Sequence, residues 1–119
     1  FVGSRGLGDV YKRQVQARGQ IEGGIAQGLG LALLEDLVLD NGKIVNANFT
    51  DYLLPTSMDT PPIKIASLIE QSEPGAPFGA KGIGEPPVIS STPAIISAVR
   101  NATGKKLSRV PIKPEDLIF

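Results

Sequence analysis

One short stretch of the sequence holds a carboxylate in an unusual setting. Glu85 lies in "PFGAKGIGEPPVI" (77–89), directly after Gly84 and before two prolines. Glycines allow close approach to a ligand and positive φ, and a proline suits the first turn of a helix. We therefore expect Glu85 at a helix N-terminus, where the helix dipole favours an ionised carboxylate. Such a group is suited to general-base chemistry, although spacing alone also allows a plain helix-start charge. The glycines expected to take positive φ are residues 79, 82 and 84.

The same loop does not match the common phosphate-binding motifs. A Walker loop needs Gly-Lys followed by Ser or Thr, whereas Lys81 stands between Ala80 and Gly82. The dinucleotide fingerprint that would begin at Gly82 needs a glycine where the chain has Pro87. Both motifs are therefore rejected, and Lys81 stays a candidate either for ligand contact or for holding the loop.

Composition excludes several kinds of site. The 119 residues include no cysteine and no histidine, which removes disulfides, iron–sulfur ligation, the usual zinc sites and Ser-His or Cys-His nucleophiles. Any metal must then be held mainly by something other than this segment. The charge balance predicts no nucleic-acid partner, and the longest apolar run, "LGLALL" (29–34), is far shorter than the roughly 20 residues of a membrane span. We expect a soluble, cytoplasmic chain.

The first residues have the appearance of a cloning scar. Residues 4–14, "SRGLGDVYKRQ", can be back-translated into the read of a transposase-type sequencing adaptor joined to its mosaic end. We therefore expect residues 1–14 to be adaptor-derived, irregular and outside the fold, since such segments are excluded from fold reasoning. Residues 15–119 would then form one small domain, the tail of a longer gene product.

The elements that position Glu85 follow from the apolar pattern. Apolar residues recur every four positions from Ile21, which predicts a helix of roughly 15 residues from Ile21 to Asp36. Glycines inside it make it a poor isolated helix. Gly24 and Gly28 lie one turn apart, and they form a bare strip that a strand, a helix or a cofactor can approach.

The remaining pattern predicts an α+β fold. Asn41-Gly42 suits the tight turn of a β-hairpin, and "IKIASLIEQ" (63–71) alternates like a mostly buried strand. A helix is expected to begin within two or three residues of Glu85. We expect it to break at Thr92-Pro93 and to end near Gly104. The tail "VPIKPEDLIF" predicts a short strand and a final helical turn begun by Pro114 and Glu115.

Three separated motifs resemble one known family. "GQIEGGIAQGLGLALLEDL", "NFTDYLLPT" and "PFGAKGIGEPP" together resemble the C-terminal part of the molybdopterin-binding large subunit of the xanthine dehydrogenase/aldehyde oxidase family, over about residues 15–119. The resemblance implies part of the second molybdopterin-binding domain. It also implies molybdopterin in this subunit and [2Fe-2S] and FAD in other domains or subunits. The cysteine-free composition agrees with it, because an organic pterin holds the metal in that family.

The resemblance also implies roles for particular residues. Glu85 matches the family's general base, which takes the proton of a molybdenum-bound hydroxyl during oxidation of purines, N-heterocycles or aldehydes with water-derived oxygen. Gln20 matches a glutamine whose amide contacts the pterin, with a helix N-cap as the other interpretation. Gly84 and Lys81 are the further cofactor-binding candidates.

This chain lacks the earlier domains of such a subunit and the iron–sulfur and flavin electron path. The resemblance therefore implies that the chain alone is inactive, with iron–sulfur and FAD subunits or domains and a small-molecule substrate as partners of the parent enzyme. A hypothesis from another class is a non-catalytic small α+β binding or assembly module, in which the glycine-rich helix packs on a partner and Glu85 only caps a helix.

Overall fold

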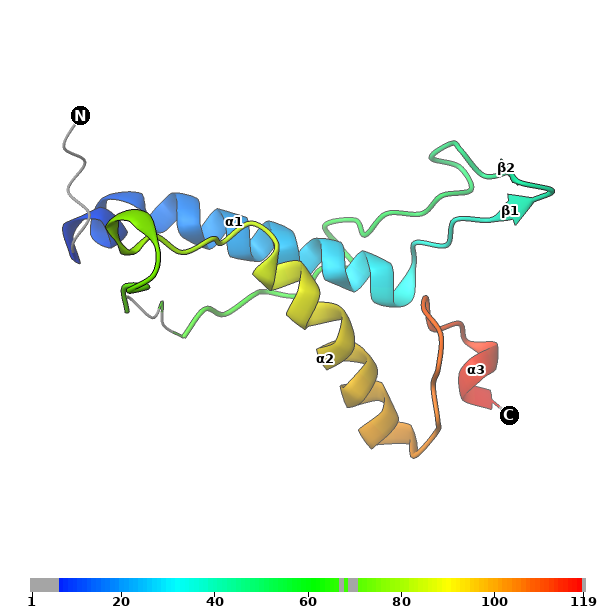
Figure 1. The fold of residues 1–119 in the computed structure, drawn as a ribbon. Coiled ribbons are helices and arrows are strands. Elements are labelled where there is room, and N and C mark those ends of the chain that lie inside the picture. The colour runs from blue at the N-terminus through cyan, green and yellow to red at the C-terminus, as the bar shows by residue number, and fades with distance from the viewer. Residues whose placement is uncertain (1–6, 67, 69–70, 119) are drawn as a thin grey trace.

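The computed structural model describes residues 7–66, 68 and 71–118, with side chains from Val15 onward. The described chain combines helices with a single two-stranded antiparallel sheet (Figure 1). None of the helices found there is both long and apolar enough to cross a membrane. The elements in chain order are α1 (Leu7–Leu33), β1 (Leu39–Asp40), β2 (Lys43–Ile44), the 3₁₀ turn η1 (Pro77–Gly79), α2 (Pro86–Thr103) and α3 (Glu115–Ile118).

Helix α1 is confirmed as a helix but is longer than the sequence pattern predicts. It begins at Leu7, so the expectation of irregular structure is wrong for residues 7–14, while residues 1–6 lie outside the described part. The sequence contains no proline before Pro55, so nothing blocks extension of the helix toward the N-terminus. The helix ends at Leu33, where the amides of the next two residues both donate to the carbonyl of Gly30 at 2.8 Å.

A second helix covers the bare strip on α1. A Cβ on Gly24 would lie 2.6 Å from Cβ of Pro87, and a Cβ on Gly28 would collide with the side chain of Ser91. Thr92 Oγ1 donates to the carbonyl oxygen of Gly28 at 3.0 Å. The sequence allowed a strand, a helix or a cofactor beside this strip, and in the structure the neighbour is a helix. Figure 1 shows α2 starting beside the middle of α1 and diverging from it toward its own C-terminus.

The hairpin is confirmed at the predicted turn. Asn41 and Gly42 have φ of 46° and 77°, the two positive values that a tight two-residue hairpin turn requires. Leu39 pairs with Ile44. Behind the turn, Asn46 is only 7% exposed. Its Oδ1 accepts the Val38 amide at 3.0 Å and its Nδ2 donates to the Asp36 carbonyl at 2.6 Å, so one side chain ties the hairpin to the end of α1.

Helix α2 begins as predicted, but the expected break is wrong. The helix is continuous across Pro93, although a proline there lacks the N–H for one helical hydrogen bond. The bond from Thr92 to α1 holds the residue just before it. Gly104 ends the helix in the left-handed conformation (φ 69°), and its amide donates to the Arg100 carbonyl at 2.8 Å, which confirms the predicted terminator.

Two predicted strands are absent from the described residues. Within 63–71, residues 63–66, 68 and 71 are irregular, and the others lie outside the described part. An alternating pattern becomes a strand only with a hydrogen-bonded neighbour, and the described sheet contains only β1 and β2. The short strand near 110–113 is likewise wrong, because the Ile112 amide instead donates to the Ala32 carbonyl at 2.7 Å. The final helical turn, α3, is confirmed.

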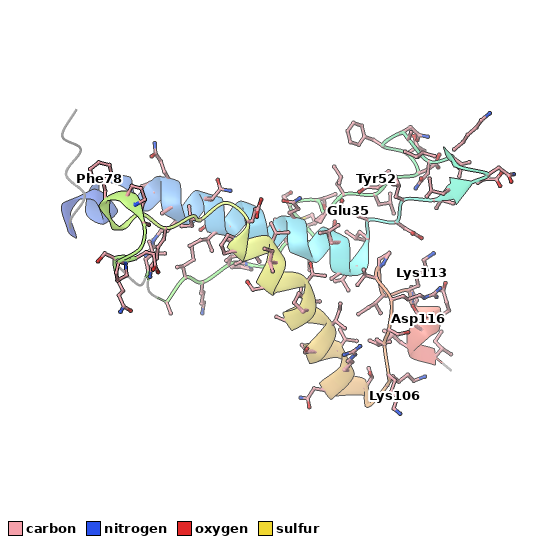
Figure 2. All side chains as sticks on the ribbon, in the orientation of Figure 1. Glu35, Tyr52, Phe78, Lys106, Lys113 and Asp116 are labelled. Carbon is pink, nitrogen blue, oxygen red and sulfur yellow. The ribbon has the colours of Figure 1, made fainter. Side chains whose placement is uncertain are left out.

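The C-terminal segment is held by charged groups. Asp116 accepts the Lys113 amide at 2.9 Å and pairs with Arg109 at 2.8 Å, and both interactions lower the pKa of its carboxyl. Lys113 in turn pairs with Asp36 at 2.8 Å. Figure 2 shows Lys113 and Asp116 together beside α3. The Lys113–Asp36 pair joins the C-terminal segment to the residues just after α1, whereas the Arg109–Asp116 pair lies within that segment.

The apolar core is thin for a chain of this length. Apart from glycines, the buried apolar residues of the described chain are Ala32, Leu107 and Ile112, together with the prolines Pro87 and Pro111. The Cα radius of gyration is 18.2 Å, whereas a compact domain of this length would have about 13.5 Å. Much apolar surface therefore faces outward.

Candidate functional site

The start of α2 fixes the backbone of Glu85. Glu85 is the residue just before the helix (φ −83°, ψ −35°). Its carbonyl oxygen accepts the amides of Val88 and Ile89 at 3.0 and 3.1 Å. The side chain is exposed and makes no hydrogen bond to the helix end. The backbone is thus held while the carboxylate is left out of the helix cap.

The two prolines explain why Glu85 does not cap the helix. A capping side chain accepts an N–H from the second or third helical residue. The second is Pro87, which has no N–H, and the third is Val88, whose amide already bonds the Glu85 carbonyl. A carboxylate placed here therefore keeps its oxygens available for a ligand or solvent.

The contact of Gly24 and Gly28 with α2 determines where the Glu85 carboxylate lies along α1. Gly24 contacts Pro87, two residues after Glu85, and Gln20 stands one turn before Gly24, on the same helical face. Gln20 and Glu85 thus lie near the same end of the α1–α2 contact, both exposed, and no hydrogen bond joins them. Because α2 covers Gly24 and Gly28, that part of the strip is not open to a cofactor.

The loop before α2 differs from its predicted conformation. Gly79 has positive φ (68°), but Gly82 and Gly84 do not, which corrects the expectation for those two residues. A Cβ on Gly79 would lie 2.6 Å from Cβ of Ser72, so a glycine is required there for space as well. Gly84 has open space around it, and Lys81 is exposed. The loop thus presents a cation and a stretch of bare backbone to solvent.

The donor set at this end suits a polar organic group more than a bare metal ion. In the described part of the chain, no three Asp, Glu, His or Cys residues are grouped to hold a metal. The exposed groups are an amide (Gln20), an ammonium (Lys81) and a carboxylate (Glu85). Such groups can hydrogen-bond a heterocycle and pair with phosphate. The residues present therefore fit contact with one side of a phosphorylated organic cofactor.

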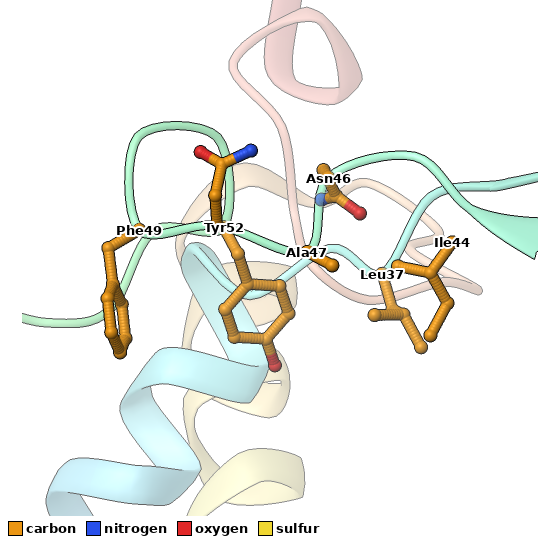
Figure 3. A pocket seen from close by; sticks show the side chains of 7 residues that line it. Leu37, Ile44, Asn46, Ala47, Phe49 and Tyr52 are labelled. Atoms are coloured by element: carbon orange, nitrogen blue, oxygen red, sulfur yellow. The ribbon is translucent and has the colours of Figure 1, made fainter.

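A concave region away from Glu85 was not identified from the sequence. A groove of about 300 Å³ lies between the hairpin and the loop that follows it (Figure 3). Tyr52 at its edge donates its hydroxyl to Glu35 at 2.6 Å, and this bond raises the pKa of Tyr52. Figure 2 shows this pair near the end of α1. The lining residues are Leu37, Ile44, Asn46, Ala47, Asn48, Phe49 and Tyr52.

Comparison with known proteins identifies relatives over most of the chain. Residues 7–61 match the family described as the molybdopterin cofactor-binding domain. The putative xanthine dehydrogenase molybdenum-binding subunit XdhA of Escherichia coli K12 is 40% identical over 103 residues, which cover 85% of this chain and 14% of that protein. The aldehyde oxidoreductase of Megalodesulfovibrio gigas is 38% identical over 108 residues, 88% of this chain and 11% of that protein.

A solved structure shares the fold. The crystal structure of quinoline 2-oxidoreductase from Pseudomonas putida 86 matches with a TM-score of 0.73 and 42% identity, over 83% of this chain and 13% of that one. The chain thus spans about a seventh of the length of these relatives or less. The family match begins at residue 7, so the interpretation of residues 1–14 as an adaptor scar receives no support.

Proposed function

Because this chain is homologous to a segment of molybdenum-containing enzymes of the xanthine dehydrogenase/aldehyde oxidoreductase type, we propose that it belongs to the molybdopterin-binding part of a molybdenum hydroxylase. In the proposed parent enzyme, molybdopterin supplies the metal centre at which substrate carbon is oxidised. The substrate class is an N-heterocycle, purine or aldehyde. The thin core and extended shape support a segment that packs within a larger subunit over an independent small module.

Glu85 is the proposed general base. Its backbone is held by Val88 and Ile89, while its carboxylate takes no part in the helix cap. That local geometry is the observation that carries the proposal, because a general base needs an oxygen free to accept a proton, and the held backbone limits where this carboxylate can reach. In the parent enzyme a carboxylate oxygen of Glu85 accepts the proton of the attacking, water-derived oxygen.

Gln20 and the loop residues Lys81 and Gly84 are the proposed cofactor contacts. The Gln20 amide donates to the cofactor from an exposed position one turn before the part of α1 that α2 covers. Lys81 pairs with its anionic groups, and Gly84 allows its close approach because no side chain stands there. Iron–sulfur and FAD domains or subunits are the proposed electron acceptors.

The test uses the full-length subunit encoded by the same gene, assembled with its partner subunits. Glu85→Gln keeps the shape of the side chain and removes its basicity. Molybdenum and pterin content should stay at the wild-type level, and reduction of the metal centre by substrate should slow by about 10²–10⁴-fold, the contribution of a general base. Rapid-reaction spectroscopy at matched molybdenum occupancy measures this rate.

The matched control is Glu115→Gln, at an exposed carboxylate in the first turn of α3. It should leave the rate unchanged. If substrate reduced the metal centre of the Glu85→Gln variant at nearly the wild-type rate, Glu85 would not be the general base. A full-length protein that contains neither molybdenum nor pterin when made in a molybdenum-replete host would contradict the function itself.

A further inference from the structure

The groove beside the hairpin exposes apolar side chains from separate segments. Phe49 is 84% exposed, Leu37 54% and Ile44 49%, and all three line the same concave surface (Figure 3). We call these three residues the hairpin groove. Single exposed apolar residues are ordinary, but a contiguous group that lines a hollow marks a binding surface.

The polar groups of this surface are already used inside the chain. The Asn46 amide bonds Val38 and Asp36. The Asn48 side chain donates to Asp51 at 3.0 Å and accepts the amide of Thr50 at 2.9 Å. The Tyr52 hydroxyl donates to Glu35. Small-molecule sites need a few polar groups directed at the ligand, so this groove is poorly suited to a polar substrate or a pterin and well suited to apolar protein side chains.

The opposite face of the hairpin is mixed, because it carries the charged Asp40 and Lys43 beside two valines. The Val45 amide donates to the Val38 carbonyl at 3.0 Å, so these two residues are paired, and both are largely exposed. Strand residues alternate between faces, so Val38 and Val45 lie on the face opposite Leu39 and Ile44. A two-stranded hairpin is marginal by itself in water, and antiparallel sheets commonly pack one apolar face against other chain and leave the other face in solvent. The face of Leu39 and Ile44 is therefore the one to be covered.

We infer that the hairpin groove docks an apolar segment from another part of the same large subunit, which covers the apolar face of the hairpin. The inference rests on the proposed function, because it takes this chain as one segment of such a subunit. The chain spans only 14% of its xanthine dehydrogenase relative, so ample additional chain is available there.

The test is site-specific photo-cross-linking in the full-length subunit, assembled as it is purified. Phe49 is replaced by p-benzoylphenylalanine, which keeps an aromatic ring in the groove. The matched control carries the same probe at Lys43, which lies next to Ile44 in β2 but points to the opposite face. After irradiation, digestion and mass spectrometry identify the peptide attached to each probe.

The expected result is a light-dependent cross-link from position 49 to an apolar peptide of the same polypeptide outside the segment described above, absent from position 43. Mixing heavy and light isotope-labelled copies distinguishes this from contact between copies. A mixed-isotope cross-link, a cross-link to another subunit, the same peptide from both positions or no cross-link above the dark control would each overturn the inference.

Molybdenum and pterin content, measured on the same preparations, separates the two ideas. Cofactor present without the expected cross-link contradicts the docking surface alone. The expected cross-link in a protein without cofactor contradicts the proposed function alone.

Discussion

At the scale of single residues, the most informative feature of Glu85 is that its carboxylate makes no hydrogen bond to the start of α2. Pro87 lacks one of the two N–H groups that a capping carboxylate would accept, and the other, from Val88, donates to the Glu85 carbonyl. The sequence predicts the helix start and the acid at its edge, because proline and glycine have strong local preferences. It does not predict that the carboxylate stays out of the helix cap, because that depends on which backbone amide donates to which carbonyl.

The Tyr52–Glu35 bond gives a prediction for pH. The hydrogen bond to Glu35 is the main cause that raises the pKa of Tyr52, followed by partial burial and the charge of Glu35. A raised pKa in the folded state means that this contribution to stability is present below the tyrosine pKa of the unfolded chain and is lost as pH rises through the folded value.

In a Tyr11→Phe background, which leaves Tyr52 as the one tyrosine, ultraviolet absorbance should show tyrosinate forming above its ordinary pKa. Glu35→Gln should bring that pKa back toward the ordinary value, because it removes both the carboxylate acceptor and the charge. Glu22→Gln, which removes a carboxylate from an exposed position elsewhere on α1, is the control. An unchanged titration in Glu35→Gln would show that the bond does not form in solution.

At the scale of elements, the contact between α1 and α2 depends on individual glycines. A Cβ added at Gly24 would meet Pro87 at 2.6 Å, whereas one added at Gly23 would meet nothing within 4 Å. Gly23→Ala should therefore stabilise α1 by up to about 1 kcal/mol through helix propensity. Gly24→Ala should instead destabilise the helix pair by about 1–3 kcal/mol, the usual cost of overpacking.

Hydrogen exchange of the α2 amides measures this difference locally. We expect α2 to exchange faster in Gly24→Ala and at the same rate or more slowly in Gly23→Ala. Equal protection in the two variants would mean that α2 does not pack on this face.

Sequence reasoning at this scale succeeds where the signal is local. The Asn41-Gly42 turn, the Gly104 terminator and the helix after Glu85 follow from residues next to one another. The strand expected at 63–71 fails at its described positions, because pairing depends on a neighbouring strand that no local pattern reveals. The break expected at Pro93 fails because contact with α1 outweighs the local preference.

At the scale of the whole molecule, the thin core predicts weak cooperativity for this chain by itself. An ordinary domain unfolds near 60 °C with an enthalpy of about 0.7 kcal/mol per residue. With so few apolar residues buried, the isolated 119-residue chain should show a broad transition with a clearly smaller enthalpy per residue. Differential scanning calorimetry of the isolated chain and of the full-length subunit makes the comparison. A sharp transition of ordinary enthalpy in the isolated chain would show that it folds as an independent domain.

The bond between the Ile112 amide and the Ala32 carbonyl has a consequence for the order of folding. Its partners lie far apart in the sequence, as do those of the α1–α2 contact. Helices form within about a microsecond from local interactions, but contacts across long intervening chain must first overcome the entropy of loop closure. Formation of α1 and α2 should therefore be early and reversible, and the slow step in assembling this fold is the closing of these two long-range contacts, α2 onto α1 and the C-terminal segment onto the end of α1.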